Sequence, residues 1–191
     1  PPFVDQDVID EVTDTLKSGW ITTGPKVKAL EAEVAKFTGV PNALGVNSWT
    51  SGAILVLKWL GIKPGDEVIV PAYTYSATAL SVLHCGATPV MVDVKDDFTI
   101  DPEKIREAIT EKTKVIMPVD FAGLTCNYDA INAIAEDESI IKIFNPEFYN
   151  MGLGLQFFKK VFDMNFFIFK SYIGDHKNVI IICFDREMSI H

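Results

Sequence analysis

Cysteine is scarce in this sequence, and its spacing follows no metal-binding pattern. The three cysteines are Cys85, Cys126 and Cys183, and no CxxC pair occurs. An odd, widely spaced set supports neither a disulfide framework nor a zinc site. We interpret all three as small buried apolar side chains and expect no metal.

Clusters of basic residues and long apolar runs are also missing. Seventeen Lys and Arg residues against 26 Asp and Glu residues give a formal net charge of -9. Because nucleic-acid binding requires basic side chains grouped against phosphates, we expect no nucleic-acid partner. No apolar stretch approaches the roughly 20 residues that span a bilayer, and no signal pattern opens the sequence. We therefore expect a globular, cytoplasmic protein without a membrane segment.

Short apolar runs alternate with helical patterns after two opening helices that end near Gly19 and Gly39. Strands are expected over 43–46, 67–70, 89–92 and 115–119, and helices over 50–60, 76–84, 102–109 and 128–135. This alternation requires crossover connections, so it predicts an α/β fold with a mostly parallel sheet and flanking helices. Neither GxGxxG nor GxxxxGK[ST] occurs, which disfavours a Rossmann-type nucleotide site.

The composition changes abruptly near residue 136. Residues 1–135 hold fourteen alanines, whereas residues 136–191 hold none and contain nine of the thirteen phenylalanines. Two hypotheses fit this tail. It could form a helix and a strand, NVIIICF, that complete the same core, or it could be translated from a shifted reading frame that begins near residues 140–145, since AT-rich DNA encodes this composition. We divide the chain into residues 1–143 and a divergent tail of residues 144–191.

Two segments carry candidate binding chemistry. Asn47-Ser48-Trp49-Thr50-Ser51-Gly52 lies between an expected strand and an expected helix, where free N–H groups and hydroxyls can bind a phosphate. Pro71 to Tyr75 follows the next strand, at the edge where open α/β sheets bind ligands, and an aromatic ring there can stack on a flat ligand. Helix capping by Ser and Thr and packing of a turn tyrosine are the structural alternatives.

The chain resembles a known family in these and further segments. SGWITTGPK, NSWTSG, GIKPGDEVIVPAYTYSATA, GATPVMVDV and AITEKTKVIMPVDFAG occur in the order and spacing of the DegT/DnrJ/EryC1/StrS sugar aminotransferases. The resemblance is especially close to the branch that forms 4-amino-4-deoxy-arabinose on a UDP carrier, and it ends near Ala135. It implies the large domain of a type I, aspartate aminotransferase-like fold, incomplete at its C-terminus.

The resemblance also implies a cofactor, substrates and site residues. The cofactor would be pyridoxal 5'-phosphate, the amino donor glutamate, the acceptor a nucleotide-linked keto-sugar, and the assembly a homodimer. The phosphate of the cofactor would lie at Trp49, Thr50 and Ser51, and its ring would stack on Tyr75. The loop from Trp20 to Pro25 matches a segment near the substrate side of the family's dimer.

Two family motifs are replaced in this sequence. Where relatives have an EDAAQ-like motif, whose aspartate pairs with the pyridine nitrogen, this chain has Asn145-Pro146-Glu147. In relatives the lysine of the motif SFHxxKN holds the cofactor covalently. This sequence matches only part of that motif, at His176-Lys177-Asn178, and we expect Lys177 to be a surface residue. We therefore expect an inactive aminotransferase fragment, or alternatively a non-catalytic cofactor-binding or dimerisation module.

Overall fold

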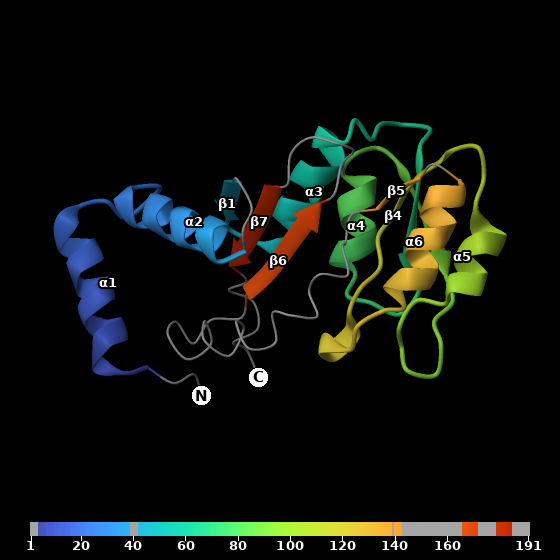
Figure 1. Cartoon of the computed structure of the whole chain (residues 1–191). Coiled ribbons are helices and arrows are strands. Elements are labelled where there is room, and N and C mark those ends of the chain that lie inside the picture. The colour runs from blue at the N-terminus through green and yellow to red at the C-terminus, as the bar shows by residue number, and fades with distance from the viewer. Residues whose placement is uncertain (1–3, 39–41, 139, 143–165, 172–178, 185–191) are drawn as a thin grey trace.

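The first two helices form an arm at one end of the molecule (Figure 1). The structure is a computed structural model, and it describes residues 4–38, 42–138, 140–142, 166–171 and 179–184. Helix α1, Gln6–Ser18, starts at the Asp5 cap and ends at Gly19, whose φ of 76° takes the left-handed conformation that glycine permits. Helix α2 covers Pro25–Thr38. No residue of α1 is buried.

Strands and helices alternate along the rest of the first 142 residues, as the sequence predicts. The helices are α3 Trp49–Trp59, α4 Ala77–Leu83, α5 Pro102–Ala108 and α6 Tyr128–Asp137, with a short 3-10 helix η1 at Phe121–Gly123. The strands are β1 Asn42–Val46, β2 Glu67–Pro71, β3 Thr88–Val92, β4 Thr113–Ile116, β5 Ile141–Lys142, β6 Phe166–Ser171 and β7 Val179–Phe184.

The central sheet has four strands in the order β3-β2-β4-β5, and all its pairings are parallel. Strand β4 ends earlier than the predicted residue 119. The Met117 amide still donates to the Ile69 carbonyl over 2.8 Å, but Pro118 has no N–H with which to continue the ladder.

Strand β1 lies in a second sheet, in the order β1-β7-β6. It pairs in parallel with β7, which in turn pairs antiparallel with β6. The strand predicted in the tail is therefore present. The predicted mostly parallel pairing is confirmed, and the described strands divide between two sheets. Strand β1 pairs with a strand that lies 130 or more residues away in the sequence, and no local sequence pattern predicts such a pairing.

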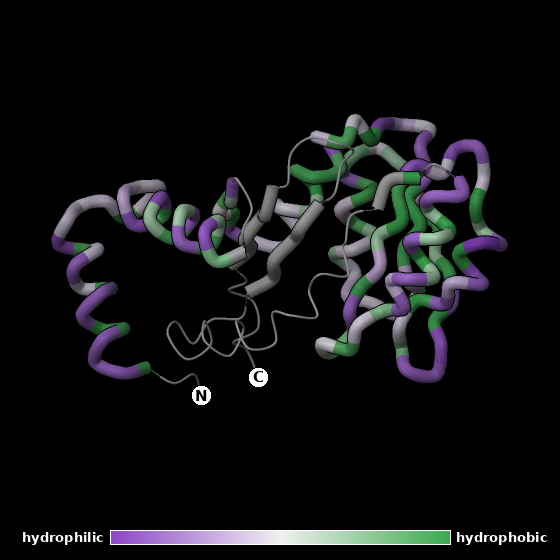
Figure 2. Tube along the Cα trace, viewed as in Figure 1, coloured by the Kyte–Doolittle hydropathy of each residue, from purple (hydrophilic) through white to green (hydrophobic). Residues whose placement is uncertain are grey.

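Apolar side chains cover both faces of the four-stranded sheet. On one face Val68 and Val70 of β2 pack in a core with Val56, Leu57 and Val82 from α3 and α4. On the other face Ile69 packs in a separate core with residues of α5 and α6, including Ile105, Ile131 and Ile134. Successive residues of a strand point to opposite faces, so β2 contributes to both cores. Figure 2 shows hydrophobic segments concentrated in this sheet and its helices.

No helix in the part of the chain that the structure describes is long and apolar enough to cross a membrane.

Candidate cofactor site

The first turn of α3 presents the predicted phosphate cradle. Ser48 is the N-cap, and its hydroxyl accepts a hydrogen bond of 3.1 Å from the Ser51 amide and lies 2.9 Å from the Ser51 hydroxyl. The first intrahelical bond runs from the Gly52 amide to the Ser48 carbonyl. These residues therefore cap the helix, which is the structural alternative that the sequence left open.

Thr50 is the residue of this turn that remains best suited to an anion. Its backbone N–H lies in the first helical turn, where no intrahelical acceptor exists, and its side chain is half-buried. The positive end of the α3 dipole adds to the attraction. Trp49 and Ser51 are half-buried beside it. The turn therefore fits the phosphate end of a cofactor, with the Ser51 amide already committed to the cap.

Tyr75 lies in the loop between β2 and α4, at the carboxyl end of β2. Its side chain is 74% exposed, so a ring face is open to a ligand. The loop is tied to both neighbours: the Ala72 amide donates to Val92 over 2.7 Å, and the Thr74 and Thr78 hydroxyls lie 3.0 Å apart. The loop is restrained, whereas the tyrosine side chain extends into solvent.

The structure brings together the elements that carry the predicted residues, but not their side chains. Helices α3 and α4 pack against each other, so the two loops that precede them lie on neighbouring elements. In the described residues no hydrogen bond or ring contact joins Tyr75 to Thr50 or Ser51. A single ligand that contacts both Tyr75 and the first turn of α3 would have to extend from one loop to the other.

An aromatic cluster at the ends of the strands was missed by the sequence reasoning. The Tyr73 ring lies 4.9 Å from Phe98 and 5.2 Å from Phe121 between ring centroids, and Phe98 and Phe121 are 5.4 Å apart. Each residue follows a different strand of the four-stranded sheet. The only sequence signal is that an aromatic residue follows each of β2, β3 and β4 within a few positions.

A carboxylate holds the turn that carries Phe98, whose φ of 65° is unusual for a residue other than glycine. Asp97 accepts hydrogen bonds from the Thr99 hydroxyl at 2.6 Å and the Thr99 amide at 2.9 Å, and it pairs with Lys95 at 2.9 Å. The Thr99 hydroxyl bond, followed by the Lys95 bond, lowers the pKa of Asp97 to about 2. The turn therefore keeps its anionic anchor at neutral pH.

A second carboxylate holds the turn that carries Phe121. Asp120 Oδ1 accepts hydrogen bonds from the Cys126 amide at 2.9 Å and from the Tyr128 hydroxyl at 3.1 Å. Burial, followed by the charge of Asp120, raises the pKa of the Cys126 thiol to about 12 and also raises the pKa of Tyr128. Both groups stay protonated at neutral pH, and Tyr128 remains a donor to Asp120.

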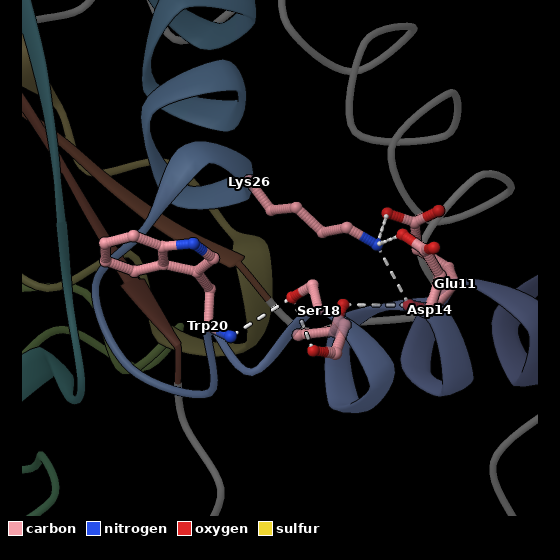
Figure 3. A network of polar contacts seen from close by, with 6 residues as sticks. Glu11, Asp14, Ser18, Trp20 and Lys26 are labelled. Atoms are coloured by element: carbon pink, nitrogen blue, oxygen red, sulfur yellow. Dashed lines mark hydrogen bonds and ion pairs between the residues drawn. The ribbon is translucent and has the colours of Figure 1, made fainter.

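The loop from Trp20 to Gly24 is fixed by ion pairs between α1 and α2 (Figure 3). Lys26 Nζ lies 2.7 Å from Glu11 and 2.8 Å from Asp14, and hydrogen bonds to Asp14 and Glu11 raise the pKa of this lysine. The Trp20 amide donates to the Ser18 hydroxyl at 3.1 Å. The Trp20 side chain is 59% exposed, so this loop presents an aromatic surface.

The replaced family motifs lie outside the described residues. This holds for Asn145 and Glu147 and for Lys177, whose predicted surface position stays a prediction. In the described part of the chain no group of three or more His, Cys, Asp or Glu side chains could hold a metal ion. A groove of about 490 Å³ between α5 and α6 is lined by none of the predicted site residues.

The fold and the strand-end loops define an α/β domain of the kind that binds ligands at the carboxyl edge of a parallel sheet. The chain belongs to the DegT/DnrJ/EryC1/StrS aminotransferase family, whose sequence profile matches residues 2–145. The family predicted from the motifs is confirmed.

Relatives of known sequence are similar over the same region. The spore coat polysaccharide biosynthesis protein SpsC of Bacillus subtilis is 46% identical over 140 residues, which cover 73% of this chain and 36% of SpsC. The UDP-4-amino-4-deoxy-L-arabinose--oxoglutarate aminotransferase of Shewanella sediminis is 46% identical over 136 residues, covering 71% of this chain and 35% of that protein. The chain therefore spans about a third of the length of these relatives.

Solved structures confirm the fold class. The PLP form of a putative sugar aminotransferase from Streptococcus pneumoniae is 50% identical and superposes with a TM-score of 0.69, over 72% of this chain and 36% of that one. The same protein has been solved in a form with pyridoxamine phosphate. The cofactor predicted for the family, pyridoxal phosphate, is therefore confirmed for these relatives.

The Cys126 thiol provides a test of the turn built around Asp120. With a pKa of about 12, its thiolate fraction at pH 8 is on the order of one in ten thousand, and the residue is 3% exposed. We expect iodoacetamide to alkylate Cys126 at least about 100-fold more slowly in the native chain than in urea, where its pKa returns toward about 8.5. Peptide-resolved mass spectrometry measures both rates. Native alkylation at the rate seen in urea would contradict the buried environment of this thiol.

Proposed function

We propose that this chain is the cofactor-phosphate-binding part of a nucleotide-sugar aminotransferase. In the complete enzyme the amino group would pass from glutamate to a nucleotide-linked keto-sugar, in a homodimer in the cytoplasm. The proposal rests on the start of α3, which lies within the residues that match the family. This helix N-terminus is capped, Thr50 is half-buried there, and the Thr50 N–H has no intrahelical acceptor.

The described residues would hold two ends of pyridoxal phosphate. The hydroxyl groups of Thr50 and Ser51 would donate hydrogen bonds to the phosphate oxygens, and the α3 dipole would stabilise the phosphate charge. Tyr75, open to solvent on the neighbouring loop, would cover one face of the pyridine ring. When bound, this cofactor supplies an electron-withdrawing ring that stabilises negative charge on the substrate carbon.

We further propose that the chain alone does not catalyse transamination. The reaction requires a lysine that holds the cofactor and moves a proton, and an acid beside the pyridine nitrogen. The sequence carries neither family motif at the expected positions, where Asn145 and Glu147 and the isolated Lys177 stand instead. We accordingly propose that residues 144–191 are a divergent segment that a shifted reading frame would produce.

A non-catalytic dimerisation module is the second candidate. The observation that favours it is α1, which buries none of its residues and exposes Ile9, Val12 and Leu16 by 47%, 55% and 64%. These apolar side chains recur at helical spacing, as on a helix face that another chain covers. A full-length relative or a second copy of this chain would supply that cover.

Affinity for pyridoxamine phosphate tests the proposed site. This form of the cofactor has no aldehyde and therefore does not react with surface lysines. We expect Thr50→Val to weaken binding roughly 10-fold or more, because a hydrogen bond to a charged group is lost. Tyr75→Ala should weaken it about 2- to 12-fold through loss of stacking. Titration calorimetry measures both.

Matched controls separate the site from general effects. Thr88→Val changes an exposed threonine at the opposite, N-terminal end of a strand, and Trp59→Ala removes a half-exposed ring at the far end of α3. Neither should alter the affinity. If Thr50→Val and Tyr75→Ala both bind like the unmodified chain, the site assignment is wrong.

Lysine labelling tests the proposed inactivity. We expect borohydride reduction in the presence of pyridoxal phosphate to give only scattered, substoichiometric lysine adducts, because the family's lysine motif is replaced in this sequence. Peptide mapping by mass spectrometry locates them. A stoichiometric adduct at Lys177 together with glutamate-dependent turnover would show that the tail supplies a working active site.

A further inference from the structure

Three aromatic side chains connect the turns that follow β2, β3 and β4. Tyr73 contacts Phe121 edge-on, with an interplanar angle of 65°, and it contacts Phe98 at 34°. The rings are partly exposed: Tyr73 by 49% and Phe98 by 46%. Because Tyr73 and Phe98 each leave about half of their area in water, burial alone does not explain the cluster.

Tyr73 is two residues from Tyr75, in the same loop. Tyr75 is 74% exposed and makes no ring contact with the described residues, so its position depends on the loop backbone. That backbone is held on the β3 side by the bond from the Ala72 amide to Val92 and on the α4 side by the Thr74–Thr78 pair. On the side of β4, the Tyr73 ring of this loop contacts the Phe121 ring.

The turn that carries Phe121 is rigid enough to act as a support. Asp120 is bonded both to the Cys126 amide and to the hydroxyl of Tyr128, which is only 4% exposed. Ala122, the next residue after Phe121, has a φ of 51°, a conformation that an alanine adopts only when surrounding contacts impose it. The hydrogen bonds of Asp120 and the constrained backbone together fix the direction in which Phe121 leaves the turn.

We propose that Phe121 is a positioning residue for Tyr75, acting through the Tyr73 ring, with Asp120 fixing the turn that presents Phe121. The proposal rests on the proposed function in so far as Tyr75 covers the cofactor ring. Phe121 itself touches neither the cofactor nor the substrate. Its role is to hold the loop after β2, and with it the backbone that carries Tyr75, in the observed conformation.

Amide hydrogen exchange in the full chain, measured by NMR, tests the proposal without any ligand. The Thr78 amide reports the loop because it donates to the Tyr75 carbonyl over 3.0 Å. In Phe121→Ala we expect this amide to exchange about 3- to 10-fold faster, the range that loss of one aromatic pair gives. The Glu67 amide, which donates to Lys112 at the opposite end of the sheet, should be unchanged.

Further variants distinguish positioning from a loss of general stability. Phe121→Tyr keeps the ring and should restore slow exchange, whereas Phe121→Leu fills much of the volume without a ring and should exchange fast. Leu124→Ala removes an exposed side chain, 49% accessible, three residues away and should behave like the unmodified chain. Equal acceleration at Thr78 and Glu67, or slow exchange in both Phe121→Ala and Phe121→Leu, would overturn the proposal.

A ligand measurement separates this proposal from the proposed function. If the unmodified chain binds pyridoxamine phosphate, Phe121→Ala should weaken that binding about 3- to 10-fold and leave the affinity for inorganic phosphate unchanged, because the ring contact alone is disturbed. If the unmodified chain does not bind pyridoxamine phosphate, the proposed function fails, and the exchange rates alone decide whether Phe121 positions the loop.

Discussion

The parallel pairing of β2 with β3 on one side and β4 on the other organises the described structure. Parallel strands end at the same edge of a sheet, so the loops after β2, β3 and β4 meet there although they are far apart in sequence. Burial of β2 on both faces fixes this pairing, since Val68 and Val70 belong to one core and Ile69 to the other. A shift of one residue would exchange the two faces and disrupt both cores.

Polar anchors then shape the loops that the sheet assembles. Asp97 holds the turn of Phe98, Asp120 holds the turn of Phe121, and Ser48 caps the helix that begins at Trp49. Each anchor uses its carboxylate or hydroxyl oxygen to accept backbone or side-chain hydrogen bonds. The aromatic rings follow strands of the four-stranded sheet, and the start of α3 follows β1. A capped helix N-terminus and an open aromatic ring are the two features that a phosphorylated flat cofactor requires.

Much of the fold could be predicted from local patterns in the sequence. The helix expected over 102–109 is α5, which begins after the Asp101 cap, and the strand expected over 67–70 is β2. The partner of β1 could not be predicted, because β7 is more than a hundred residues away and strand choice depends on the assembled sheet. The aromatic cluster was missed for the same reason: Tyr73, Phe98 and Phe121 become neighbours only through strand pairing. The family and its cofactor followed from long motifs, whereas the roles of Thr50 and Tyr75 remain predictions.

Chemical-shift mapping with pyridoxamine phosphate tests most directly whether the start of α3 holds the phosphate. The ligand is titrated into the ¹⁵N-labelled chain, and each amide is followed by NMR. The account predicts that the largest shifts fall on the amides of Thr50 and Ser51, with smaller shifts around Tyr75. Largest shifts at the groove between α5 and α6, near Arg106 and Ala133, with none at Thr50, would contradict it.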